Sequence, residues 1–86
     1  MTIKILKMVN GEEIITKKVS NICSKARSVR MINDPQKGPS LALVPFFILD
    51  PDCEFKINEN NVVGEINAPS EVEKTYLQET SGIQLA

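Results

Sequence analysis

Turn-forming residues divide the first seventy residues of this chain into short segments. Asn10 and Gly11 form a strong hairpin signal, because both residues tolerate a positive φ angle. Two prolines and a glycine mark residues 34–39 as a loop, and an asparagine-rich stretch marks residues 58–61 as a tight turn. The segments between these turns are rich in alternating and β-branched residues. The pattern therefore predicts a mainly β fold.

Six short segments have the pattern of strands, and residues 24–27 are expected to form a polar corner between the second and the third. The segments are residues 3–8, 12–22, 28–33, 41–49, 53–58 and 62–68. The first segment changes the face of its apolar residues at Leu6, which indicates either a bulge or a strand covered on both faces. Short strands joined by tight turns in so small a chain favour a strongly bent barrel of SH3-like or OB-like type.

The most apolar segment, residues 41–49, carries apolar side chains at both strand parities and contains Pro45. We expect it to be a strand buried on both faces, with Pro45 at an edge or a bulge because proline has no N–H to donate. Nine residues are far fewer than the roughly 20 needed to cross a bilayer. We therefore expect no membrane span.

The last part of the chain changes from strand to helix periodicity. Ser70 and Glu73 have the spacing of a capping box, and Val72 and Tyr76 lie four residues apart on one helical face. These signals predict a helix over residues 71–80 that docks through Val72 and Tyr76.

Gly82 is the expected helix stop, and an apolar end follows at residues 83–85. The predicted organisation is a single domain in which residues 1–69 form a barrel and residues 70–86 form a helix and tail packed on it.

Composition excludes several classes of function. Ten basic and eleven acidic residues give a formal charge of −1, which argues against a generally basic nucleic-acid binder. The chain has no histidine, so the usual base of hydrolytic triads and dyads is missing, and we expect no enzyme. Cys23 and Cys53 lack a metal-binding spacing, and we expect no metal and no cofactor. They are interpreted as small buried or half-buried hydrophobes, with a disulfide between them left open. The N-terminal segment lacks a secretory pattern, which favours a cytoplasmic protein.

Two segments in the expected order resemble the motifs of the Sm-like family, which includes bacterial Hfq. Met8-Val9-Asn10-Gly11 resembles the point at which the first strand of that family turns into the second. Phe55-Lys56-Ile57, a tight turn, Val62-Val63 and Pro69-Ser70 resemble the second motif. In length and style the chain is also similar to small Sm-like proteins encoded by tailed phages of cyanobacteria.

The resemblance implies a five-stranded Sm-like barrel that assembles into a homo-oligomeric ring of about five to seven subunits. In such rings the fourth strand of one subunit pairs with the fifth strand of its neighbour. A ring would also cover the apolar strand, because an unpaired apolar edge is a hazard for a lone chain. The residues expected at this interface are Leu41, Leu43, Phe46, Phe47, Val62 and Val63.

The resemblance further implies non-catalytic binding of single-stranded RNA around a central pore, with Lys25, Arg27, Lys56 and Asn58 as the contacting residues. The sequence departs from the family where Ile57 replaces the histidine of the bacterial Lys-His pair. Lys25 and Arg27 are also explained as solvated loop charges, and Asn58 as an ordinary turn residue. The alternative function is a ring-forming protein-interaction module or phage accessory factor that binds no RNA and uses residues 34–39 or the C-terminal helix.

Overall fold

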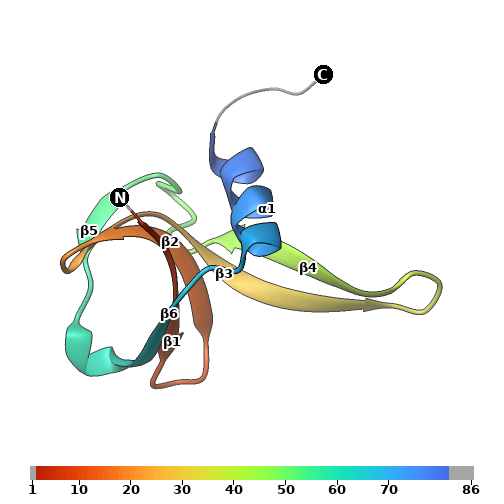
Figure 1. The fold of residues 1–86 in the computed structure, drawn as a ribbon, viewed down its shortest axis with the longest axis horizontal. Helices are drawn as coiled ribbons and strands as arrows, with labels where there is room; N and C mark the ends of the chain where they lie inside the picture. The colour runs from red at the N-terminus through yellow and green to blue at the C-terminus, as the bar shows by residue number, and fades with distance from the viewer. Residues whose placement is uncertain (1, 82–86) are drawn as a thin grey trace.

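The computed structural model describes residues 2–81 as one antiparallel sheet of six strands with a C-terminal helix (Figure 1). The elements are β1 (Thr2–Met8), β2 (Glu13–Val19), β3 (Ile22–Asp34), β4 (Gly38–Pro45), β5 (Glu54–Lys56), the 3-10 turn η1 (Glu59–Asn61), β6 (Val62–Asn67) and α1 (Ser70–Thr80). The strand order is β4-β3-β2-β1-β6, and β5 pairs with β3. The prediction of a mainly β fold with a C-terminal helix is confirmed.

The hairpin between β1 and β2 is the one that Asn10 and Gly11 predict. Gly11 has a φ angle of +89°, a conformation that glycine adopts without steric cost. The side chain of Asn10 accepts a hydrogen bond of 3.0 Å from the backbone N–H of Glu12. This bond closes the turn and holds Asn10 and Glu12 in fixed positions relative to each other.

The expected polar corner at residues 24–27 is wrong, because β3 runs through it without a break. The register changes from Ile15 opposite Arg27 to Lys17 opposite Ser24, so β3 contains a bulge at this point. Lys25 occupies the bulge with a φ angle of +53°, which the surrounding pairs impose on it. The polar residues therefore bend a long strand instead of ending it.

A closed five-stranded barrel is also not what these residues form. Six strands are present, and β5 and β6 do not pair within residues 2–81, so the sheet stays open. Pro45 ends β4 and residues 46–53 leave the sheet before β5 begins. The η1 turn then redirects the chain, and β6 pairs with β1 instead of β5.

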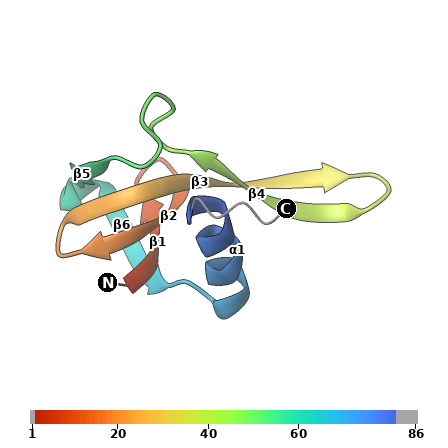
Figure 2. The ribbon, with the colours of Figure 1, turned by 90° about the horizontal axis from the view of Figure 1, so that it is seen from above.

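The expectation that residues 41–49 form one strand buried on both faces is wrong as well. The strand ends at Pro45, and beyond it Ile48 is 77% exposed and Leu49 is fully exposed. The β3–β4 hairpin projects from the rest of the sheet (Figures 1 and 2) and carries exposed apolar residues on both of its strands. Among residues 2–81, no second layer of the fold covers them.

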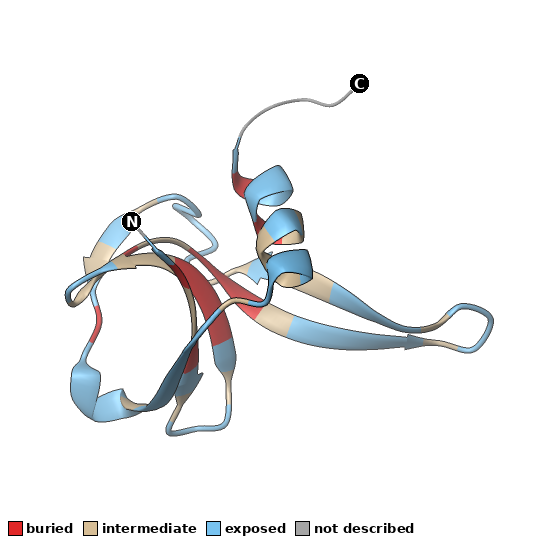
Figure 3. Ribbon diagram, in the orientation of Figure 1, coloured by how far each residue is buried: buried red, intermediate tan, exposed pale blue. Residues whose placement is uncertain are grey.

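Two apolar clusters cover the two faces of the sheet, which explains the change of parity in β1. The first is built on Leu6, Ile14, Cys23 and Ile57 inside the bend, and the second on Ile3, Ile15 and Tyr76 beneath α1. Figure 3 shows that most of the buried residues lie where the bent sheet and the helix meet. Buried Cys23 and half-buried Cys53 are both free, so no disulfide joins them. In the predicted strand at residues 53–58, Cys53, Phe55 and Ile57 are buried or half-buried and alternate with exposed neighbours.

Helix α1 begins one residue earlier than predicted and docks through the predicted stripe. Tyr76 is fully buried, and its hydroxyl donates to the backbone oxygen of Lys25 at 2.7 Å. Val72 packs on the same cluster as Tyr76. The capping box is wrong, because Pro69 is the N-cap and Ser70 is already helical. Gly82 and residues 83–85 lie outside the described residues.

Candidate functional site

Arg27, one of the four predicted RNA contacts, is hydrogen-bonded to other residues of the chain. It is 7% exposed, and its guanidinium donates to the Asp52 carboxylate at 3.0 Å and to the Pro51 carbonyl at 2.7 Å. These bonds tie residues 46–53 to the middle of β3. The same guanidinium is not available to a phosphate unless they break.

Lys25 also has a role inside the fold. Its ammonium donates to the Thr80 carbonyl at 3.1 Å, near the C-terminal end of α1. A cation is favourable there because the last carbonyls of a helix carry partial negative charge. Together with the Tyr76 hydroxyl bond, this contact holds the helix over the β3 bulge.

The remaining two predicted contacts lie around β5. Lys56 is exposed and pairs through its backbone with Ile22. The side chain of Asn58 accepts from the backbone N–H of Asn60 at 3.0 Å and caps η1. The described structure therefore gives Lys25, Arg27 and Asn58 structural partners, and leaves Lys56 as the one of the four without an ion pair or side-chain bond.

The six predicted interface residues divide into two groups. Leu43, Phe46 and Val62 are half-buried against the two apolar clusters. Leu41, Phe47 and Val63 are exposed, and β6 adds Ile66, which the sequence analysis did not select. These exposed residues belong to, or directly follow, the two edge strands of the sheet, β4 and β6.

Charges on the face of β1, β2 and β6 that also carries Leu6 neutralise one another. Lys18 lies 2.7 Å from Glu65 and 3.4 Å from Glu59, and Lys4 lies 3.8 Å from Glu65. Hydrogen bonding to Glu65 raises the pKa of Lys18, and the same bond lowers the pKa of Glu65. This face therefore offers little free positive charge to a nucleic acid.

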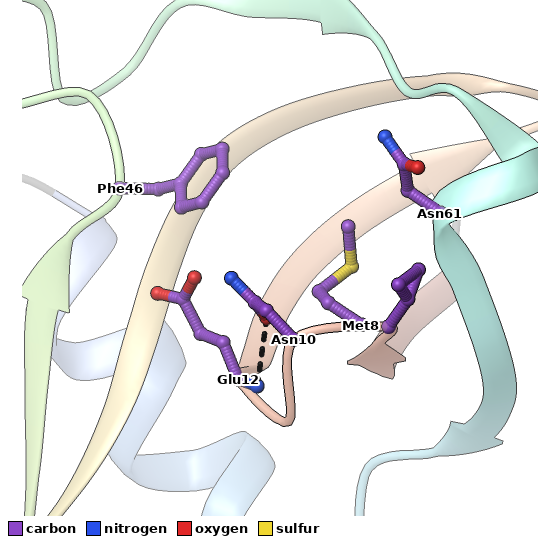
Figure 4. Close-up of a pocket in the computed structure, with 6 residues that line it drawn as sticks. Met8, Asn10, Glu12, Phe46 and Asn61 are labelled. Atoms are coloured by element: carbon purple, nitrogen blue, oxygen red, sulfur yellow. Dashed lines mark hydrogen bonds between the residues drawn. The ribbon is translucent and has the colours of Figure 1, made fainter.

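A pocket that the sequence analysis missed lies where three separate segments meet. It has a volume of about 290 Å³ and is lined by Met8, Val9, Asn10, Glu12, Phe46 and Asn61. Figure 4 shows the labelled side chains around one hollow, with Phe46 on one side, Asn61 on the other, and the β1–β2 hairpin between them. We call this hollow the hairpin pocket.

Glu12 is the charged residue of the hairpin pocket and differs from the solvated turn charge that its position suggests. It is half-buried, and one carboxylate oxygen, Oε2, accepts from the buried Ser28 hydroxyl. Arg30 lies 3.9 Å from the same oxygen. Glu13, which follows Glu12 in the sequence, is exposed and forms an ion pair with Lys7 at 3.2 Å. The two adjacent carboxylates therefore have different environments.

Phe46 forms the apolar wall of the hairpin pocket and is held by two other aromatic rings. Its centroid lies 5.7 Å from that of Phe55 in a stacked arrangement and 5.2 Å from that of Phe47 in an edge arrangement. Such contacts fix the orientation of a ring. The hairpin pocket thus combines a fixed aromatic wall with amide and carboxylate groups.

The part of the chain that the structure describes contains no group of three or more His, Cys, Asp or Glu residues placed to hold a metal ion. Within the same part, α1 is too short and too polar to span a bilayer. No protein-family model matches this chain, and no curated protein matches it either.

Proposed function

We propose that this protein is an Sm-like subunit that forms a homo-oligomeric ring and binds single-stranded RNA without catalysis. The observation that carries the proposal concerns β4 and β6, the two strands at opposite edges of one bent sheet. Each has one backbone edge without a partner strand and carries exposed apolar side chains. The sequence resemblance, centred on the Met8–Gly11 turn and the Val62-Val63 segment, points to the same family.

The six strands are compatible with the five of an Sm-like barrel if β4 and β5 are two halves of one interrupted strand. Both pair with β3, on the edge opposite to β2. Between them the backbone N–H of Phe46 still donates to Ala26 of β3 at 3.0 Å. Counted in this way, the fourth and fifth strands are the two free edges of the sheet.

Free edges of this kind favour assembly. Val63 is 67% exposed and Ile66 is 57% exposed on β6, while Leu41 and Val44 are exposed on β4. Pairing β4 of one copy with β6 of the next would satisfy the backbone groups of both edges and bury apolar side chains. Because the two edges are different surfaces, such contacts run head to tail and close into rings when the rotation allows.

RNA binding in this proposal depends on repetition around the ring. Each subunit contributes the exposed Lys56, and about five to seven copies would place that many cations around one axis. Arg27 and Lys25 support the architecture of the site instead of contacting phosphate, because their side chains bind Asp52 and Thr80.

Native mass spectrometry of the protein, with and without oligouridylate or oligoadenylate at low salt, tests both halves of the proposal. We expect one ring mass and a bound oligonucleotide at micromolar ring concentration. Val63→Lys should shift the mass toward monomer, because lysine on an edge strand blocks pairing. The matched control, Leu77→Lys on the exposed face of α1, should leave the ring intact. A monomer at tens of micromolar would contradict the ring, and a ring without oligonucleotide would contradict RNA binding.

A second candidate is a ring-forming protein-interaction module or phage accessory factor without RNA. It is favoured by the engagement of Arg27 and by the exposed Ile48 and Leu49 in the segment after β4. Recovery of one protein partner through these residues, together with the absorbance ratio of pure protein in the isolated ring, would support it over the RNA proposal.

A further inference from the structure

We infer that the hairpin pocket binds a guanine base. The inference rests on the proposed function to the extent that the base belongs to a single-stranded RNA, but the pocket lies within one chain. Its volume of about 290 Å³ is just below the usual range for ligand pockets, roughly 300–1,000 Å³. A hollow of that size suits one ring system with a wall to stack on. Phe46 supplies that wall.

The polar groups of the pocket have unused hydrogen-bonding capacity. Ser28 and Arg30 both approach Oε2 of Glu12, which leaves Oε1 without a partner among residues 2–81. Asn10 uses its side-chain oxygen to accept from the Glu12 backbone, so its NH2 group remains as a donor. Asn61 lies across the pocket, and its side-chain amide has no partner within the described residues (Figure 4). The pocket therefore offers a carboxylate acceptor and an amide donor that are tied together by the hairpin.

Guanine is the base that matches this combination. Its Watson–Crick edge places two neighbouring donors, N1–H and the N2 amino group, beside the acceptor O6. One donor fits Oε1 of Glu12, and the other shares Oε2 with the Ser28 hydroxyl, because each carboxylate oxygen has two lone pairs. O6 fits the Asn10 amide. Adenine would direct the lone pair of N1 at the carboxylate, and uracil has only one donor on that edge. A site built to bond two donors discriminates strongly against a base that lacks them.

The main competitor is the guanidinium of an arginine from a protein partner, which also presents two neighbouring donors. Guanidinium has no acceptor, so the Asn10 amide would remain unused. Arg30, which lies 3.9 Å from Glu12, would also repel a second guanidinium. It lines an adjoining hollow that shares Glu12 with the hairpin pocket, where it would instead meet the phosphate of a nucleotide. Both observations favour a guanine nucleotide over an arginine side chain.

Titration of the full-length protein with mononucleotides, followed by the NMR signals of its asparagine side-chain amides, tests the inference. We expect GMP to bind at least about tenfold more tightly than AMP or UMP, the discrimination typical of a bidentate base contact. IMP, which lacks the N2 amino group, should lose most of that advantage without any change to the protein. Equal binding of GMP and AMP, or equal binding of GMP and N-acetylarginine amide, would overturn the inference.

Glu12→Gln should reduce GMP affinity about tenfold, because glutamine supplies a single acceptor, although it still accepts from Ser28. Glu79→Gln is the matched control and should leave GMP affinity unchanged, because Glu79 is exposed on α1 and lines neither the hairpin pocket nor the adjoining hollow. If both variants bind GMP like the unaltered protein, the carboxylate has no part in binding and the inference is wrong.

Oligonucleotides separate the two sources of the base. A uridylate heptamer with one central guanine should bind more tightly than the all-uridine heptamer if the base comes from RNA. If GMP binds but the guanine adds nothing to the heptamer, the ligand is a free guanine nucleotide and the guanine site stands. Heptamer binding without GMP binding would contradict this inference and leave the proposed function intact. GMP binding without any heptamer binding would do the reverse.

Discussion

At the scale of single residues, Tyr76 joins the packing of the helix to a measurable titration. Burial raises the pKa of its phenol to about 12, whereas the pKa of an unfolded tyrosine is about 10. Above pH 10 the unfolded chain therefore releases this proton before the folded chain does. The free energy of unfolding should be constant in this respect below pH 10 and should fall by about 2–3 kcal/mol between pH 10 and 12.

The Tyr76→Phe variant isolates that contribution. It should be less stable by about 1 kcal/mol near pH 8, because the bond to the Lys25 carbonyl is lost. Its unfolding free energy should then decline less steeply than that of the unaltered protein from pH 10 to 12. Urea unfolding monitored by circular dichroism at several pH values measures both effects. Parallel decline of the two proteins would show that Tyr76 does not titrate differently in the folded state.

Local signals predicted several residues correctly because neighbours in the sequence determine their structure. The Asn10-Gly11 turn, the Val72–Tyr76 stripe and the strand within residues 53–58 are of this kind. Arg27 was missed because its partners are Pro51 and Asp52, more than twenty residues away. No local pattern distinguishes such an arginine from a solvated one.

At the scale of elements, β3 organises the sheet, and it contains a bulge where the sequence predicted a corner. Residues 24–27 are polar, which favours a corner, but pairing with β2, β4 and β5 keeps them in an extended strand. The hairpin pocket was missed for a related reason. Its lining comes from the β1–β2 hairpin, from Phe46 and from Asn61, and only the fold brings these three segments together.

The segment 46–53 should depend on Arg27 for its position. Arg27→Ala removes the buried guanidinium together with its hydrogen bonds to Ala26, Pro51 and Asp52, and we expect it to lower the free energy of unfolding by about 2–4 kcal/mol. Arg30→Ala is the matched control on the same strand, and because Arg30 is exposed it should change stability by less than about 1 kcal/mol. Urea unfolding gives both values. Equal effects of the two substitutions would mean that the Asp52 contact does not stabilise the fold.

At the scale of the whole molecule, one chain and an assembled ring differ in what they can bind. A single chain has a formal charge of −1, and five of its ten basic side chains lie within 4 Å of a carboxylate in the described structure. One copy of Lys56 would attract RNA only weakly. The proposed ring would repeat this lysine without adding a new kind of contact, and several weak contacts to one strand would act together.

Salt dependence distinguishes this repeated contact from a general charge effect. If Lys56 meets phosphate, Lys56→Ala should reduce the slope of log affinity against log salt by about 0.7 for each subunit that the RNA touches. Lys74→Ala removes another exposed lysine, from α1, and is the matched control, with the slope expected to stay the same. Fluorescence anisotropy of labelled oligouridylate over a range of salt concentrations measures the slope. Equal reductions for both variants would mean that the net charge of the ring, and not the position of Lys56, controls binding.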